Sequence, residues 1–174
     1  MRRLVDRARI DRVMEAFALA ADAPTSVYLV GGTTAVLQGW RDSTVDVDVV
    51  MRPENDALMR EFPAIKERLE VNIELASPLD FIPVPIGWED RSPLIRRIEQ
   101  VEFRHFDLCA QALAKIERGH TQDMLDVREI LDRGLASREQ LRAGFAAIEP
   151  QLYRFPAVDP AGFRRAIEAT AASR

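Results

Sequence analysis

The sequence predicts an α/β (α+β) fold, in which a small mixed β-sheet is flanked by helices and followed by a helical C-terminal part. Two observations lead to this class. In roughly the first 100 residues, short β-branched or alternating runs take turns with helical patterns, which indicates strands and helices in succession. In the rest of the chain the apolar residues recur only at helical spacing. A chain of 174 residues with 47% hydrophobic content is large enough for one domain with a real core.

The first elements follow from hydrophobic spacing. Apolar residues in the range 5–21 recur every three or four positions, which predicts a helix with Ile10, Val13, Met14 and Phe17 on its buried stripe. The run SVYLV predicts a strand that ends at a glycine pair, and TTAVLQGW predicts a short helix that ends near its glycine.

The next strand has one polar face. In the stretch TVDVDVV, Val45, Val47 and Val49 alternate with Asp46 and Asp48. Successive side chains of a strand point to opposite faces, so the valines are expected to face the core and the aspartates to face solvent.

The following segment predicts a helix over residues 54–70 with a break at Pro63, and then a second alternating strand, VNIEL. Glu74 lies on the polar face of that strand. The apolar side chains expected to point away from it are Val71, Ile73 and Leu75.

The second half of the chain is predicted to be mostly helical. Residues 76–97 are rich in proline and predict an ordered loop, and residues 98–103 predict a last strand. Helices are expected at about 107–119, 121–133, 137–148 and 159–172. The expected organisation is an α/β core over residues 1–106 and a helical segment over residues 107–174, packed on the core as one compact unit.

Composition narrows the function classes. A net charge of -4 gives no chain-wide basic field for holding a long nucleic acid. A single cysteine, Cys109, excludes an internal disulfide and every multi-cysteine zinc pattern. The charged N-terminus does not fit a signal peptide, and no run of apolar residues is long enough for a membrane span. We therefore expect a soluble, cytoplasmic protein with no membrane association.

Asp46 and Asp48 are the first candidates for chemistry. Their Cα atoms are expected to lie about 6.5 to 7 Å apart on one strand face, where two ionised carboxylates repel each other unless water or a cation compensates them. A divalent cation explains the pair economically, because Mg²⁺ binds one or two protein carboxylates together with substrate phosphates. The alternative is an edge strand with a solvated acidic face.

The glycine turn is the second candidate. Gly31 and Gly32 let the main chain approach a ligand closely, and Thr33 adds a hydroxyl at the start of the next helix. Unpaired N–H groups and the helix dipole favour phosphate at such a position. The alternative is an ordinary turn between a strand and a helix.

The motif GGT, followed by DVD on the next strand, resembles the nucleotidyltransferase superfamily of the DNA polymerase beta type. The stretch GWRDSTVDVDVV is similar to the version found in bacterial nucleotidyltransferase-like proteins. The resemblance implies the nucleotidyltransferase fold, a D-x-D pair that binds two Mg²⁺ (or Mn²⁺) ions, and a third carboxylate on a neighbouring strand. We assign the third carboxylate to Glu74 from its strand face, with Asp80 as the second choice.

The helical part contains the pattern K-x-x-R followed by D-x-x-D, formed by Lys115, Arg118, Asp123 and Asp126. It resembles the nucleotidyltransferase toxins of type IV toxin–antitoxin systems, which implies that the basic residues contact nucleotide phosphates and leaves a cognate partner protein open. In the alternative, the aspartates hold the basic residues in ion pairs, or all four are solvated. Arg41 either steers a phosphate or pairs with a neighbouring acid.

The leading hypothesis from the resemblance is transfer of a nucleoside monophosphate from a nucleoside triphosphate, such as ATP, to a hydroxyl acceptor. A tRNA or other RNA end, a protein and a small molecule all stay open as acceptors. Two alternatives also stay open. One is a non-catalytic protein of the same fold, such as one half of a toxin–antitoxin pair, and the other is a phosphate-binding module that does not depend on metal.

Overall fold

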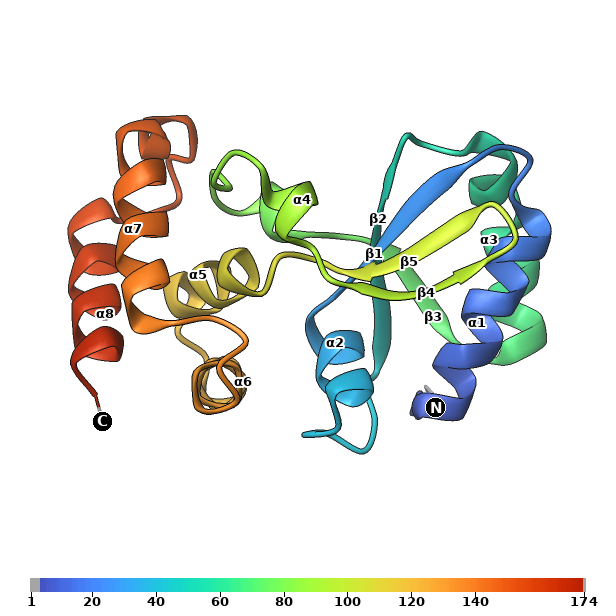
Figure 1. Cartoon of the computed structure of the whole chain (residues 1–174), viewed down its shortest axis with the longest axis horizontal. Helices are drawn as coiled ribbons and strands as arrows, with labels where there is room; N and C mark the ends of the chain where they lie inside the picture. The colour runs from blue at the N-terminus through green and yellow to red at the C-terminus, as the bar shows by residue number, and fades with distance from the viewer. Residues whose placement is uncertain (1–3, 174) are drawn as a thin grey trace. The chain divides into compact units, whose positions relative to one another are not determined.

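The computed structural model describes residues 4–173, and the chain divides into two compact units (Figure 1). The first unit comprises the described residues of Met1–Ser77 together with Ser92–Phe106. The second comprises Pro78–Arg91 together with the described residues of Asp107–Arg174. The packing of residues 107–174 on residues 1–106 stays a prediction.

The first unit is built on a five-stranded mixed sheet with the order β3-β2-β1-β5-β4. Its central strand β1 (Thr25–Val30) runs antiparallel to β2 (Asp46–Arg52) and parallel to β5 (Val101–His105). The outer strand β3 (Asn72–Leu75) runs parallel to β2, and β4 (Leu94–Ile98) runs antiparallel to β5. The mixed sheet with flanking helices confirms the predicted fold class.

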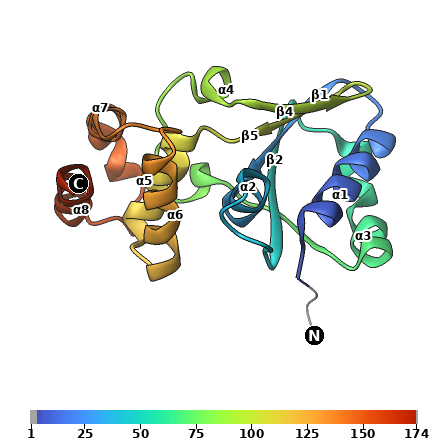
Figure 2. The same ribbon diagram turned by 60° about the horizontal axis from the view of Figure 1, so that its bottom comes forward.

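Helices α1 (Arg7–Ala20) and α3 (Asp56–Leu69) lie side by side and share the main hydrophobic core with the sheet (Figure 2). The rings of Phe17 and Phe62 stack between them, with centroids 5.1 Å apart. All four apolar residues predicted for the buried stripe of the first helix are in the core, which confirms the helical spacing. The short helix α2 (Gly31–Gln38) directly follows β1.

The structure corrects the predicted break at Pro63, because α3 continues through this proline. A proline inside a helix removes one main-chain hydrogen bond and costs about 3 kcal/mol. Pro63 itself is exposed, while Leu58, Phe62 and Ile65 on the other side of the helix are buried. Burial of this apolar stripe offsets the local cost, so the helix persists.

Two predicted core residues are also corrected. Val45 precedes β2 and is 43% exposed, and Leu75 at the end of β3 is 57% exposed. Val45 lies outside the strand, and Leu75, although it pairs with Val49, is the last residue of the outer strand β3, so neither side chain is covered as the alternation predicted. Residues 76–97, expected as a loop, contain a 3-10 helix (Pro78–Asp80), helix α4 (Trp88–Arg91) and the beginning of β4.

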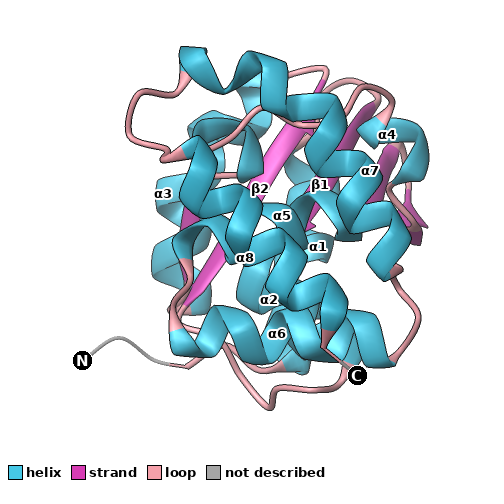
Figure 3. Cartoon of the chain, turned by 90° about the vertical axis from the view of Figure 1, so that its left-hand side faces the viewer, coloured by secondary structure: helices cyan, strands magenta, loops and turns pink. Residues whose placement is uncertain are grey.

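The regular structure described after residue 106 is helical, as predicted (Figure 3). It begins with α5 (Leu108–Arg118) and α6 (Thr121–Asp132) and continues with α7 (Arg138–Ile148), a 3-10 helix (Glu149–Arg154) and α8 (Pro160–Ala172). Among the residues described, no helix has both the length and the apolar character needed to span a bilayer.

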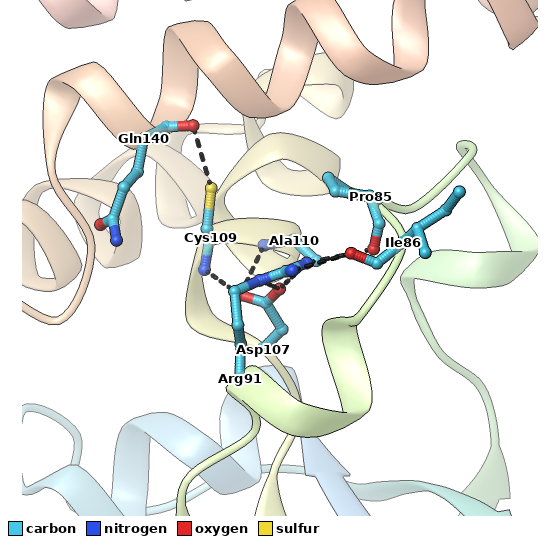
Figure 4. A network of polar contacts seen from close by, with 7 residues as sticks. All are labelled: Pro85, Ile86, Arg91, Asp107, Cys109, Ala110 and Gln140. Carbon is cyan, nitrogen blue, oxygen red and sulfur yellow. Dashed lines mark hydrogen bonds and ion pairs between the residues drawn. The ribbon is translucent and has the colours of Figure 1, made fainter.

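An ion pair attaches the segment Pro78–Arg91 to the start of α5 (Figure 4). The guanidinium of Arg91 donates to Asp107 Oδ2 at 2.8 Å and to the main-chain oxygens of Ile86 and Pro85 at 2.8 and 3.1 Å. Asp107, which is almost fully buried, also caps α5 by accepting a hydrogen bond from the N–H of Cys109. A charged pair in such an environment is stronger than an exposed one, so it orders the proline-rich segment.

Cys109 lies beside this network. Burial, with the charge of Asp107 as the second cause, raises the pKa of its thiol to about 12. The thiol is therefore protonated at neutral pH, and its Sγ donates to the main-chain oxygen of Gln140 at 3.4 Å (Figure 4). A protonated thiol is a poor nucleophile, which agrees with a packing role for this cysteine.

Candidate active site

The carboxylates Asp46 and Asp48 lie on β2, next to β3. The parallel register pairs Asp46 with Asn72 and Asp48 with Glu74. Paired residues of neighbouring strands point to the same face, so these four polar side chains occupy one face at this edge of the sheet. The valines that alternate with the aspartates in β2 are fully buried on the opposite face.

Asn72 connects two of the three predicted metal ligands. Its Nδ2 donates to Asp46 Oδ1 at 2.8 Å and to Glu74 Oε1 at 2.6 Å. The sequence analysis did not select Asn72 as a site residue. Its position on the same strand face as Glu74 was the available signal, but an amide carries no charge that would mark it as a ligand.

The glycine turn lies against the second aspartate. Val30, the last residue of β1, pairs with Asp48, and α2 begins at the next residue, Gly31. Gly31 has a φ of 60°, which favours glycine, and a Cβ added to it would lie 3.4 Å from Asp48 Oδ2. The carboxylate and the first turn of α2 therefore share one location, which joins the two motifs found in the sequence.

Gly32 is in still closer contact with the segment before β2. A Cβ at this position would lie 2.1 Å from Thr44 Oγ1 and 3.5 Å from Arg41 Nη1. The guanidinium of Arg41 therefore lies beside the glycine turn. Thr44 Oγ1 donates to the main-chain oxygen of Asp46 at 3.2 Å, so it holds the start of the aspartate strand.

Both threonine hydroxyls of α2 are buried and bonded to the main chain. Thr33 Oγ1 donates to Asp46 O at 3.4 Å, and Thr34 Oγ1 donates to Leu29 O at 3.1 Å. The side chains thus anchor the turn to β1 and β2. An approaching phosphate would meet the main-chain N–H groups at the start of α2, where Val30 makes no side-chain cap.

The fit at Gly32 gives a first testable prediction. Gly32→Ala places a methyl group where Thr44 lies, so Thr44 must move and its bond to Asp46 O is lost. We expect a loss of about 1 to 3 kcal/mol in the free energy of unfolding, measured by urea denaturation. In the double variant Gly32→Ala/Thr44→Gly the clash is absent, so its loss should be smaller than the sum of the two single losses. Additive losses would show that the contact is not responsible.

The basic residues of the helical part lie in the second unit and form ion pairs with the two aspartates of the same pattern. Lys115 Nζ lies 3.1 Å from Asp123 Oδ1 and 2.7 Å from Asp126 Oδ2. The side chains of Lys115 and Asp126 are only 7% and 1% exposed. This arrangement is the ion-pair alternative of the sequence analysis, and phosphate contact by Lys115 stays a prediction.

Arg118 is in a different position from Lys115. Its Nη2 lies 2.8 Å from Asp123 Oδ1, yet its side chain is 39% exposed, and its guanidinium lies 5.9 Å from the ring centroid of Phe81. Burial alone would raise the pKa of Asp123, but the charges and hydrogen bonds of Lys115 and Arg118 outweigh it, so this pKa lies below its usual value. Asp80, the second choice for the third carboxylate, lies in the 3-10 helix of the same unit.

Asp46, Asp48 and Glu74 of the first unit offer carboxylate oxygens, which are the ligands that a hard divalent cation such as Mg²⁺ prefers. Within residues 4–173, no three His, Cys, Asp or Glu side chains lie close enough together to hold a metal ion. Mg²⁺ needs only one or two protein carboxylates when substrate phosphates and water complete its shell. Asp46 and Asp48 satisfy that requirement, and metal binding by Asp46, Asp48 and Glu74 stays a prediction.

The features of the first unit define a class of protein. A mixed sheet whose central strand leads into a glycine turn, with a D-x-D pair on the antiparallel neighbouring strand, is typical of a nucleotidyltransferase-like domain. A family model described as "Nucleotidyltransferase of unknown function (DUF6036)" matches residues 8–149, and the chain belongs to this family. Searches of the curated proteins and of the solved structures found no match.

Proposed function

We propose that this protein is a nucleotidyltransferase that moves a nucleoside monophosphate from a nucleoside triphosphate to a hydroxyl acceptor. The observation that carries the proposal is the position of Asp48. Its Oδ2 lies 3.4 Å from the place of a Cβ on Gly31, and its strand partner is Glu74. The main-chain N–H groups that would bind phosphate and the carboxylates that would bind the ion therefore lie at the same end of β1 and β2.

Asp46 and Asp48 would hold Mg²⁺ or Mn²⁺, and Glu74 would complete the site. When bound, such an ion offsets charge on the phosphate oxygens and lowers the pKa of an attacking hydroxyl. The main-chain N–H groups of Gly31, Gly32 and Thr33 would bind the phosphates of the nucleotide.

The chemical step is an in-line displacement at the α-phosphorus. The acceptor oxygen forms a bond to phosphorus, the bond to the bridging oxygen breaks, and pyrophosphate leaves. Glu74 would accept the proton of the acceptor hydroxyl. Arg41 would offset the negative charge of the phosphates, because its guanidinium lies beside the turn.

The role of the second unit is less direct. Lys115 already donates to two aspartates, whereas the side chain of Arg118 is partly exposed. Arg118 is therefore the better candidate of the two for a phosphate contact. A small molecule, a protein or an RNA end such as that of tRNA would serve as acceptor, and we expect the reaction in the cytoplasm.

A second candidate function is binding of a partner protein without nucleotide transfer, as one component of a toxin–antitoxin pair. It is favoured by the buried ion pair of Lys115, which occupies the ammonium that would otherwise contact phosphate. Such a protein would have no requirement for nucleotide or metal, so nucleotide binding separates it from the first candidate.

Calorimetric titration of the full chain with each nucleoside triphosphate in MgCl₂ tests the proposal. We expect binding that EDTA abolishes and that Asp46→Asn or Asp48→Asn weakens at least about tenfold, because each variant removes one charged ligand. Asp42→Asn is the matched control, since Asp42 is exposed in the loop before β2 and should leave the affinity unchanged.

Absence of binding by the wild type with every triphosphate would refute the proposal, and binding insensitive to EDTA would indicate a phosphate-binding module. For the acceptor, the wild type and Asp48→Asn are incubated with α-labelled triphosphates and a cell lysate. Label that enters RNA, protein or small molecules only with the wild type identifies the acceptor class.

A further inference from the structure

His105 is a buried polar residue outside the predicted site. It is the last residue of β5, directly paired with Leu29 of β1, and it is 6% exposed. Its Nδ1 lies 3.3 Å from Thr34 Oγ1. Burial of a polar ring costs free energy unless the ring is hydrogen-bonded, so the contact with Thr34 offsets the cost of burying His105.

The direction of this hydrogen bond follows from its neighbours. The hydroxyl of Thr34 has one hydrogen, which it donates to the main-chain oxygen of Leu29 at 3.1 Å. With that hydrogen on the bond to Leu29, we assign His105 Nδ1–H as the donor and Thr34 Oγ1 as the acceptor. The same Leu29 oxygen also accepts the N–H of Phe106 at 2.9 Å, so strands β1 and β5 and helix α2 meet at this point.

The protonation state agrees with this assignment. Burial, with the charge of Arg7 as the second cause, lowers the pKa of His105 to about 4. The ring is neutral at physiological pH and has a single N–H, which the hydrogen bond to Thr34 places on Nδ1.

Helix α2 depends on such contacts for its position. It has eight residues, and a helix of this length is not stable by itself. At its other end, Arg7 Nη1 donates to the main-chain oxygen of Leu37 at 2.9 Å. Thr34 follows directly on the glycine turn, so a displacement at Thr34 is passed to the N–H groups of Gly31 and Gly32 through one continuous turn of helix.

We propose that His105 is a positioning residue, which sets the first turn of α2 for phosphate binding by donating a hydrogen bond to Thr34. The inference rests on the proposed function for the identity of the ligand. The fixing of the turn itself can be measured without any nucleotide.

The first test is a double-mutant cycle on nucleotide affinity, measured by calorimetry in MgCl₂ with the triphosphate that the wild type binds best. His105→Leu and Thr34→Val each remove one partner of the hydrogen bond at similar volume. Each is expected to weaken binding about fivefold, and the double variant no more than either single one, because the same bond is lost. His105→Asn keeps an N–H donor near the place of Nδ1 and should restore most of the affinity.

Thr25→Val is the matched control. Thr25 is also buried, and its Oγ1 donates to a main-chain oxygen, that of Pro53, at the opposite end of β1. This variant makes the same chemical change and should lower stability without changing affinity. Unchanged affinity in His105→Leu and Thr34→Val, or an equal loss in Thr25→Val, would overturn the inference.

The second test is amide hydrogen exchange of residues 30–38 without nucleotide. Exchange there should be faster in His105→Leu and Thr34→Val than in the wild type and Thr25→Val. If the wild type binds no triphosphate, the proposed function fails. The hydrogen-exchange result alone then shows whether His105 fixes the first turn of α2. Unchanged exchange in this segment would mean that His105 does not fix the turn.

Discussion

Lys115→Met is expected to destabilise the protein by about 3 to 5 kcal/mol, because it removes the ammonium that donates to both Asp123 and Asp126 in a buried place, while Asp123 keeps only its contact with Arg118 among the two basic partners. Lys115 Nζ lies within 3.1 Å of both Asp123 and Asp126, and the side chain of Asp126 is almost inaccessible to water. Methionine has similar length and no charge, so packing changes little while the pairing is lost. Urea denaturation followed by circular dichroism at neutral pH measures the effect.

The matched control lies on α6, the helix that contains Asp123 and Asp126. Arg128 and Asp132 form an exposed pair one turn apart on α6, at 3.4 Å, and Arg128→Met should cost less than about 1 kcal/mol. Lys115→Met loses a charge that lowers the pKa of Asp123, so this carboxyl should take up a proton more readily in the variant. Its deficit relative to the wild type is therefore expected to shrink as the pH is lowered toward about 5. A cost equal to that of Arg128→Met would show that the buried cluster contributes no special stability.

The second large effect is a loss of stability in mild acid that depends on His105. The pKa of this residue is about 4 in the folded chain and about 6.5 in an unfolded one, so only the unfolded chain takes up the proton between these values. The contribution is fully present above about pH 6.5 and is lost as the pH falls toward 4. We expect the free energy of unfolding to drop by about 2 kcal/mol between about pH 7.5 and pH 5.

His105→Asn removes the titrating group and serves as the comparison. Its unfolding free energy should change by only a few tenths of a kcal/mol over the same interval, apart from changes shared with the wild type. The other histidine, His120, is exposed, and most carboxylates titrate below this range. Parallel pH curves for the wild type and His105→Asn would contradict the assignment of a buried, neutral histidine.

The parts of the fold that could be predicted from the sequence are those with a strong apolar period. The helix that became α1 and the helices after residue 106 have an apolar stripe facing a core, and their ends follow from glycines and capping residues such as Gly119 and Ser137. The strand β4 was not recognised, because its sequence LIRRI has no alternation and lies on the sheet edge with Leu94 exposed. An edge strand is defined by its partner more than by its own residues.

The candidate site could be predicted in part for a related reason. The period of two along a strand places Asp46 and Asp48 on one face, and the same rule applies to Glu74. The sequence could not indicate that Asn72 bonds two of these carboxylates, or that Thr44 occupies the space beside Gly32. The bond from Asn72 to Asp46 depends on the register between β2 and β3, and the contact of Thr44 with Gly32 depends on how the segment before β2 packs against α2; no local pattern encodes either.

The ion pair between Arg91 and Asp107 has a consequence for how the chain can be divided into fragments. Its partners belong to one unit, but the β4–β5 hairpin of the other unit lies between them in the sequence. Neither unit is a single uninterrupted length of polypeptide. A fragment cut between residues 106 and 107 would leave Arg91 without its carboxylate and α5 without the segment that contains the buried Ile82. During synthesis, too, Pro78–Arg91 must wait for the hairpin to be made before its own partner helix exists.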